Sequence, residues 1–283
     1  MDTYEELEAA IESQQNSLLF SVKQLLFGAE GIDVAEVKSR RTVVESGFQS
    51  RRDQAQTAVS QIEKQTERAK RTGDPLPEGF APDPVDLERQ SEELASFRTD
   101  NQRYLRSDEH ETLASLSTVL ADWAEYVRVK RDFDREIDRV RPLIESLVQD
   151  AKPYLEYAAY LTAPDEQRIQ ESIPRVRNEL ATLRTRVNIS VLADADRDRL
   201  ARLDRQIDTI TKTTEGYNEE FVERQRDEYS LLFTNIDDDG HNLNPSQQRA
   251  VVRNGYYNQV VAGAGTGKTF ALIYRVAYLV RKG

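Results

Sequence analysis

The stretch VKSRRTVVESGFQSRRDQAQTAVSQIEKQTERA, residues 37–69, indicates the fold of most of this chain. Its apolar positions step by threes, fours and sevens, which is the spacing of one face of an α-helix. These positions are Val37, Val44, Phe48, Ala55, Val59, Ile62, Thr66 and Ala69. Charged and polar side chains fill the positions between them, so the stretch predicts a long helix with one buried face.

Three more series with this spacing follow along the chain. They occupy residues 113–161, 169–187 and 200–221. Pro142 and Pro153 are expected to kink or interrupt the helix of the first of these series. The turn at residues 188–196 predicts an antiparallel hairpin of the last two. We interpret the stripes as helices that pack against one another; an interaction or dimerisation arm is the alternative, because heptads do not identify the partner helix.

A proline-rich segment and a set of large aromatic residues stand out within this helical region. Four prolines within residues 72–85 forbid continuation of the first helix, so this segment is the clearest linker. Large aromatic side chains, which are expected in the core, recur further along. They are Trp123, Tyr154, Tyr157 and Tyr160, and a platform for stacking bases is the alternative for the three tyrosines.

Composition excludes several classes of protein. The chain has 31% charged residues, few glycines and prolines outside two places, no cysteine and two histidines. Disulfides are therefore excluded, and a Cys/His metal site is not expected. The acidic N-terminus does not resemble a signal peptide, and no run of 18 apolar residues occurs, so we expect a cytoplasmic protein without a membrane span.

Charge is unequally distributed. Six basic residues and no acidic ones follow Gly240, although the whole chain has a net charge of −11. The negative charge therefore lies in the residues before Gly240. A region with this acidic excess is not expected to bind nucleic acid as a whole. Local arginine pairs at residues 40–41 and 51–52 are the candidates for individual contacts, with a solvated helix face as the simpler interpretation.

Residues 260–269, VVAGAGTGKT, combine β-branched residues, a glycine-rich turn, a lysine and a hydroxyl residue. Backbone N–H groups of such a turn surround phosphate oxygens, while the lysine adds a charge and the hydroxyl an oxygen for Mg²⁺. The residues expected to hold the phosphates are Ala262, Gly263, Ala264, Gly265, Thr266, Gly267, Lys268 and Thr269. Ala262 stands where the general motif has its first glycine. We expect a strand at residues 259–262 and a helix at about 269–282, whose eight apolar residues no sheet in this chain covers.

Residues 243–251, LNPSQQRAV, precede this loop and predict a helix with Asn244 as N-cap and Pro245 at its first position. A glutamine carboxamide both donates to and accepts from one edge of adenine. Gln247 is therefore the candidate residue for contact with a nucleotide base.

Together these two motifs resemble the superfamily I DNA helicases of the UvrD/Rep type. Residues 217–222 and 229–233 resemble the approach to the motor in the DNA helicase IV branch. The resemblance implies ATP and Mg²⁺ as cofactors, DNA as the partner and ATP-dependent unwinding as the activity. It also implies that Gln247 contacts adenine, Lys268 neutralises the β- and γ-phosphates, and Thr269 binds Mg²⁺, so that Lys268 and Thr269 are the catalytic candidates.

The resemblance covers only the last quarter of the chain. No acidic residue follows Gly240, so the acidic motif, the arginine finger and the second motor subdomain of such helicases are not expected here. The expected architecture is mainly α: an elongated, coiled-coil-like accessory region at residues 1–233 and the start of a RecA-like ATP-binding domain at 234–283. We therefore expect the N-terminal portion of a helicase that binds ATP without hydrolysing it. The alternative is a helical interaction protein with a vestigial nucleotide loop.

Overall fold

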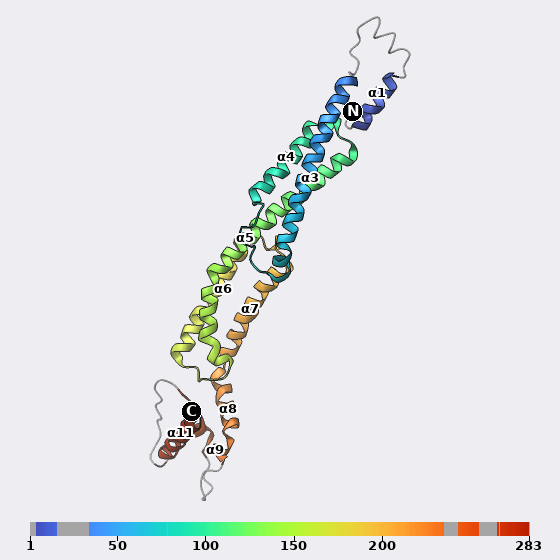
Figure 1. Cartoon of the computed structure of the whole chain (residues 1–283). Coiled ribbons are helices and arrows are strands. Elements are labelled where there is room, and N and C mark those ends of the chain that lie inside the picture. The colour runs from blue at the N-terminus through green and yellow to red at the C-terminus, as the bar shows by residue number, and fades with distance from the viewer. Residues whose placement is uncertain are drawn as a thin grey trace. The chain divides into compact units, whose positions relative to one another are not determined.

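The structure is a computed structural model that describes residues 4–15, 34–77, 79–234, 243–254, 265 and 267–282. Figure 1 shows the order of the helices. They are α1 (Tyr4–Gln15), α3 (Val34–Thr72), α4 (Pro84–Asp100), η1 (Gln102–Tyr104), α5 (Ser107–Leu155), α6 (Ala163–Arg186), η2 (Ile189–Val191), α7 (Asp194–Thr214), α8 (Tyr217–Glu228), α9 (Ser230–Thr234), α10 (Pro245–Val252) and α11 (Lys268–Lys282). Every regular element within the described ranges is helical, so the predicted mainly α class is confirmed. The expected strand at 259–262 lies outside these ranges.

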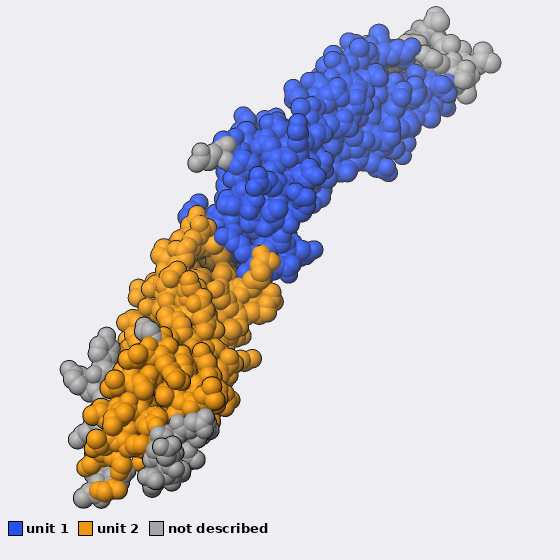
Figure 2. All heavy atoms as spheres, turned by 60° about the horizontal axis from the view of Figure 1, so that its bottom comes forward, with its two compact units in different colours: residues 1–135, 187–199 blue, residues 136–186, 200–283 orange. Residues whose placement is uncertain are grey.

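Two compact units make up the chain, and Figure 2 colours them separately. Unit 1 comprises Met1–Arg135 and Val187–Arg199, and unit 2 comprises Glu136–Arg186 and Leu200–Gly283. Helix α5 contributes residues to both units. The division expected from sequence, with a nucleotide-binding domain starting at residue 234, stays a prediction.

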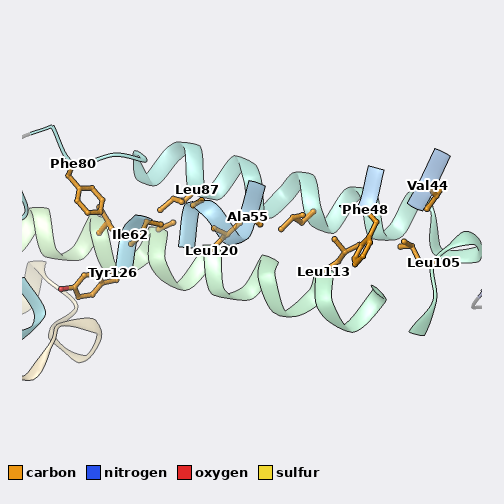
Figure 3. Close-up of a cluster of buried hydrophobic side chains, with 14 residues drawn as sticks. Val44, Phe48, Ala55, Ile62, Phe80, Leu87, Leu105, Leu113, Leu120 and Tyr126 are labelled. Carbon is orange, nitrogen blue, oxygen red and sulfur yellow. The ribbon is translucent and has the colours of Figure 1, made fainter. Parts of the chain in front are cut away.

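The core of unit 1 lies between α3, α4 and the first part of α5, as Figure 3 shows. The stripe predicted on α3 is confirmed, because Val44, Phe48 and Ile62 are all buried there. They pack with Leu87 of α4 and Leu120 of α5 in one hydrophobic cluster. One detail differs from the expectation: Ala58 is buried, whereas the neighbouring Val59 is only partly buried.

A charged residue also occupies the buried face of α3. The guanidinium of Arg41 donates to both carboxylate oxygens of Glu109 at 2.7 Å and to the carbonyl of Tyr104 at 2.9 Å. The buried ion pair therefore has the additional hydrogen bond that such a pair needs. Arg41 is thus engaged inside unit 1, and Arg52 pairs with the adjacent Asp53, so both arginines already have acidic partners.

The proline-rich segment between α3 and α4 packs within unit 1. Helix α3 ends at Thr72, as the prolines predicted, and Gly73 follows with a φ of 73°. Phe80 is buried in the core cluster, and the Gln65 side chain donates to the carbonyl of Ala81 at 2.9 Å. Trp123, which was expected in the core, is half-buried at its edge with the Lys70 ammonium 3.8 Å above its ring.

In unit 2, helix α5 runs without interruption through Pro142, so the proline does not end the helix; the kink that was the other expectation there stays a prediction. A proline removes one backbone hydrogen bond, which the packing of the same helix face offsets. Val140 and Ile144, which flank the proline, are buried. Pro153 is close to the end of the helix at Leu155.

Helices α6 and α7 pair in an antiparallel hairpin, as predicted. Arg177 and Arg184 of α6 form ion pairs with Asp208 and Asp204 of α7, respectively. The helix expected over residues 200–221 is nevertheless two helices, because the chain breaks between α7 and α8. Gly216 lies there in the left-handed conformation, with φ 69° and ψ 6°, which is typical of a residue that ends a helix.

The tyrosines at and just beyond the end of α5 pack against aromatic rings of α8. Tyr154 is buried as expected, whereas Tyr157 and Tyr160 are half-buried. The Tyr157 ring stacks on Tyr217 at a centroid distance of 5.3 Å, and the Arg224 guanidinium lies 3.7 Å over Tyr157. These ring faces are therefore occupied by other side chains of unit 2.

The described helices also differ from membrane-spanning ones. None of them combines the length and the apolar character that crossing a bilayer requires.

Candidate nucleotide-binding site

The first turn of α10 fixes the candidate adenine-contacting side chain. Asn244 is the N-cap: its Oδ1 accepts from the backbone N–H of Gln247 at 3.0 Å. In return, Oε1 of Gln247 accepts from the backbone N–H of Asn244 at 2.8 Å. This reciprocal capping box satisfies two helix-end donors and holds the Gln247 carboxamide in one orientation.

The described part of the phosphate-loop motif has the backbone that the motif requires. Gly265 and Gly267 both have positive φ angles, 74° and 76°. Glycine adopts this conformation without steric penalty, and turns of this kind point successive N–H groups toward a bound anion. Helix α11 begins directly after them at Lys268, one residue earlier than expected, and has no acidic residue in its first turn. Lys268 and Thr269 are both exposed there.

The two motifs meet in space. A Cβ atom placed on Gly267 would lie only 2.7 Å from Nε2 of Gln247, although 20 residues separate them in sequence. The structure therefore brings Gln247 against the glycine that directly precedes Lys268. Four of the predicted phosphate-contacting residues, Ala262, Gly263, Ala264 and Thr266, lie outside the described residues, and their contacts stay predictions.

An arginine joins α11 to α10. Nη1 of Arg275 donates to the carbonyl of Val251 at 2.5 Å, and Nη2 donates to Oδ1 of Asn254 at 2.7 Å. Burial lowers the pKa of the Arg275 guanidinium. The two acceptor oxygens compensate for the water that this partly buried cation has lost. The helices that carry Gln247 and Lys268 are thereby tied together.

Helix α8 completes the arrangement. The Tyr278 hydroxyl of α11 donates to Oε1 of Gln225, and both side chains are buried. Burial raises the pKa of Tyr278 to about 12, so this hydroxyl stays protonated as a donor. The ammonium of Lys282 lies 4.7 Å from the Phe221 ring centre, and burial lowers its pKa. On the side facing α10, Nε of Arg226 donates to Oε1 of Gln248 at 2.7 Å.

Comparison with known proteins bears on the same residues. The family described as the UvrD/REP helicase N-terminal domain matches residues 243–283, which contain both motifs. The chain resembles a UvrD-type helicase. Over 124 residues, or 44% of its length, it is 30% identical to DNA helicase IV of Escherichia coli (strain K12). The resemblance to UvrD-type helicases predicted from the two motifs is thereby confirmed.

The UvrD-type resemblance is partial. The matching segment spans only 17% of the length of the Escherichia coli helicase. No solved structure matches the chain.

Sequence reasoning located Gln247, Gly267, Lys268 and Thr269, but it missed the residues that hold their helices together. These are Gln225, Arg226, Gln248, Arg275 and Tyr278. A polar group that bonds to a neighbouring helix has no periodic signal that separates it from solvated neighbours.

Proposed function

We propose that this chain supplies the ATP-binding start of a UvrD-type DNA helicase. Gln247 contacts the adenine edge of ATP, and the loop of residues 262–269 surrounds its phosphates. The observation that carries the proposal is the close approach of Nε2 of Gln247 to Gly267, the glycine directly before Lys268. The family match at residues 243–283 supports the same assignment.

The residues at the start of α11 fit a triphosphate. Positive φ at Gly265 and Gly267 turns backbone N–H groups inward, and the positive end of the helix dipole adds to them. The Lys268 ammonium supplies a point charge for the outer phosphates, and the Thr269 hydroxyl an oxygen ligand for Mg²⁺. No aspartate or glutamate in the first turn of α11 repels the anion.

Turnover needs more than these groups. Phosphoryl transfer requires residues that orient the attacking water and stabilise the transferring group. Residues 241–283 contain no acid at all. We therefore propose that this chain binds Mg²⁺ and ATP without hydrolysing it, and that DNA unwinding belongs to the complete helicase.

Binding of a ribose-labelled fluorescent ATP with Mg²⁺ to the full chain tests this function. Lys268→Ala should weaken binding at least about tenfold, because the lysine contacts charged phosphate oxygens. Arg281→Ala is the matched control, since it removes one positive charge from the opposite end of the same helix and should leave binding unchanged. If Lys268→Ala binds as wild type does, the loop does not hold phosphate, and a helical interaction protein with a vestigial loop is the better description.

Steady-state ATPase with single-stranded DNA is the second measurement. We expect the wild-type chain to remain at the level of the Lys268→Ala variant. Clear turnover that this substitution abolishes would contradict the proposal that the chain lacks the hydrolytic groups.

A further inference from the structure

An ion pair within α8 orients the side chain of Arg226 toward the first turns of α10. Its Nη1 atom donates to both carboxylate oxygens of Glu223, one turn earlier, at 2.7 and 2.6 Å. Its Nε atom is then left to donate to Oε1 of Gln248 at 2.7 Å. The side chain is only 27% exposed, so these bonds form in a partly desolvated setting where they are stronger than at an open surface.

The bond from Arg226 determines which way the Gln248 carboxamide faces. With Oε1 turned to the arginine, Nε2 of Gln248 donates to the carbonyl of Leu243 at 2.8 Å. A reversed amide would place its NH₂ group against the guanidinium and its oxygen against that carbonyl, so two repulsive contacts would replace two hydrogen bonds. Arg226 therefore excludes the reversed orientation.

The peptide group between Leu243 and Asn244 is held on both sides as a result. Its carbonyl accepts from Gln248, and its N–H donates to Oε1 of Gln247 at 2.8 Å. The plane of this one peptide links the two adjacent glutamines. Whatever orients Gln248 therefore also orients the carboxamide of Gln247.

We propose that Arg226 is a positioning residue for base recognition, because it fixes the carboxamide of Gln247 through Gln248 and the Leu243–Asn244 peptide. The inference rests on the proposed binding of ATP at Gln247 and the phosphate loop. It makes α8, a helix of the region that precedes the helicase match, part of the selectivity for adenine. Arg226 does not touch the nucleotide, so its loss affects the choice of base and leaves the grip on phosphate intact.

The test compares ribose-labelled fluorescent ATP and GTP on the full chain, with inorganic tripolyphosphate as a competitor that has no base. Two hydrogen bonds to one base edge give a preference of at least about fivefold for ATP over GTP in the wild type. Arg226→Ala should bring the two affinities to within about twofold of each other while tripolyphosphate binds as before. Gln248→Glu should act in the same way, because its carboxylate still accepts from Arg226 and cannot donate to the Leu243 carbonyl.

Arg224→Ala is the matched control on the same helix. Arg224 pairs with Glu220, and its guanidinium lies over the Tyr157 ring. Its removal takes away the same charge and should leave the ATP preference intact. Circular dichroism on each variant records whether helix content and melting temperature match the wild type.

The outcomes separate the two proposals. Loss of the ATP preference in Arg226→Ala and Gln248→Glu, with unchanged tripolyphosphate affinity and an unaffected Arg224→Ala, supports the positioning role. Lys268-dependent nucleotide binding with no ATP preference in the wild type, or with equal preference in the wild type and Arg226→Ala, overturns the inference alone. A parallel loss of tripolyphosphate binding in Arg226→Ala also overturns it, since the effect would then be general unfolding of the site. No Lys268-dependent binding at all overturns the proposed function and this inference together.

Discussion

Helices α6 and α11, both in unit 2, use their apolar residues in opposite ways. The apolar stripe of α6 is buried throughout at 7% exposure or less: Ile169, Ile173, Val176, Leu180 and Leu183. On α11 the large aliphatic side chains are exposed by 43–76%: Leu272, Ile273, Val276, Leu279 and Val280. Burial thus depends on a packing partner and not on apolar content, since α6 has the more polar sequence.

The first turns of the two helices also differ. Asp165 in the first turn of α6 accepts hydrogen bonds from Thr162 at 2.6 Å, Tyr154 at 2.9 Å and Arg168 at 2.7 Å. The first turn of α11 contains no acidic residue. The N-terminus of α6 thus has an anion of its own, whereas the N-terminus of α11 has no acidic side chain in its first turn and is the end that we propose binds phosphate.

Hydrogen exchange should show the largest difference between the two helices. We expect backbone amides of α11 to exchange about 100 to 1,000 times faster than those of α6, because few buried contacts oppose local opening of α11. Mass spectrometry of the isolated full chain measures this directly. Equal protection would mean that the apolar face of α11 is covered in solution, and the segment would then be a self-contained module.

A matched pair of leucines compares the two stripes by mutation. Leu180→Ala should lower the free energy of unfolding by about 3 kcal/mol, because it opens a cavity in a packed interface. Leu272→Ala, at a position that is 64% exposed, should change it by less than about 0.5 kcal/mol. Urea unfolding followed by circular dichroism gives both values, and similar losses would show that the face of α11 is buried.

Ligand should stabilise α11 and leave α6 unaffected. At a concentration ten times its dissociation constant, Mg²⁺ and ATP should add about 1.4 kcal/mol of stability by mass action. The melting temperature with and without nucleotide tests this, and Lys268→Ala should abolish the gain. A gain of equal size in that variant would place the nucleotide elsewhere.

The smallest effect concerns the acid of α6 and depends on pH. The hydroxyls of Thr162 and Tyr154, with Arg168, lower the pKa of Asp165 below its ordinary value. A carboxylate with a lowered pKa in the folded state stabilises the protein above its unfolded pKa and loses that contribution as the pH falls through the folded one. Asp165→Asn should therefore cost about 1 kcal/mol at pH 7, as the group is partly exposed, and this cost should fall away as the pH drops below the ordinary pKa of an aspartate.

Asp208→Asn is the control for this titration. Asp208 forms an exposed ion pair with Arg177, so its replacement should change stability little at any pH. A pH-independent cost for Asp165→Asn would contradict the electrostatic explanation.

The stripes of α3, α5 and α6 were predictable because helical spacing alone determines which face is apolar. Arg41 was not, because its partner Glu109 lies 68 residues away and only the fold brings the two together. The break between α7 and α8 lies at Gly216, which adopts the left-handed conformation. The sequence did not reveal this break, because the apolar series continues on both sides of the glycine. Pro142 was expected to kink or interrupt α5, and the helix continues through it because tertiary packing outweighs the loss of one backbone hydrogen bond.

The candidate site divides in the same way. Gln247, Lys268 and Thr269 belong to local motifs, each with a specific chemical role, and such motifs can be recognised in a single sequence. Arg226 and Arg275 act through neighbours on other helices, and their role depends on distances that no sequence pattern records. The motifs therefore predict a nucleotide site, while the contacts that hold its helices in place become visible only in the fold.

The close approach of Gln247 to Gly267 restricts how the two positions can evolve. Any side chain at residue 267 would meet an amide that the capping box prevents from moving aside, and the positive φ there would add strain. A residue at 247 short enough to make room could no longer reach a base. A substitution at one of the two positions alone is therefore unfavourable, so related sequences should retain both residues or replace both.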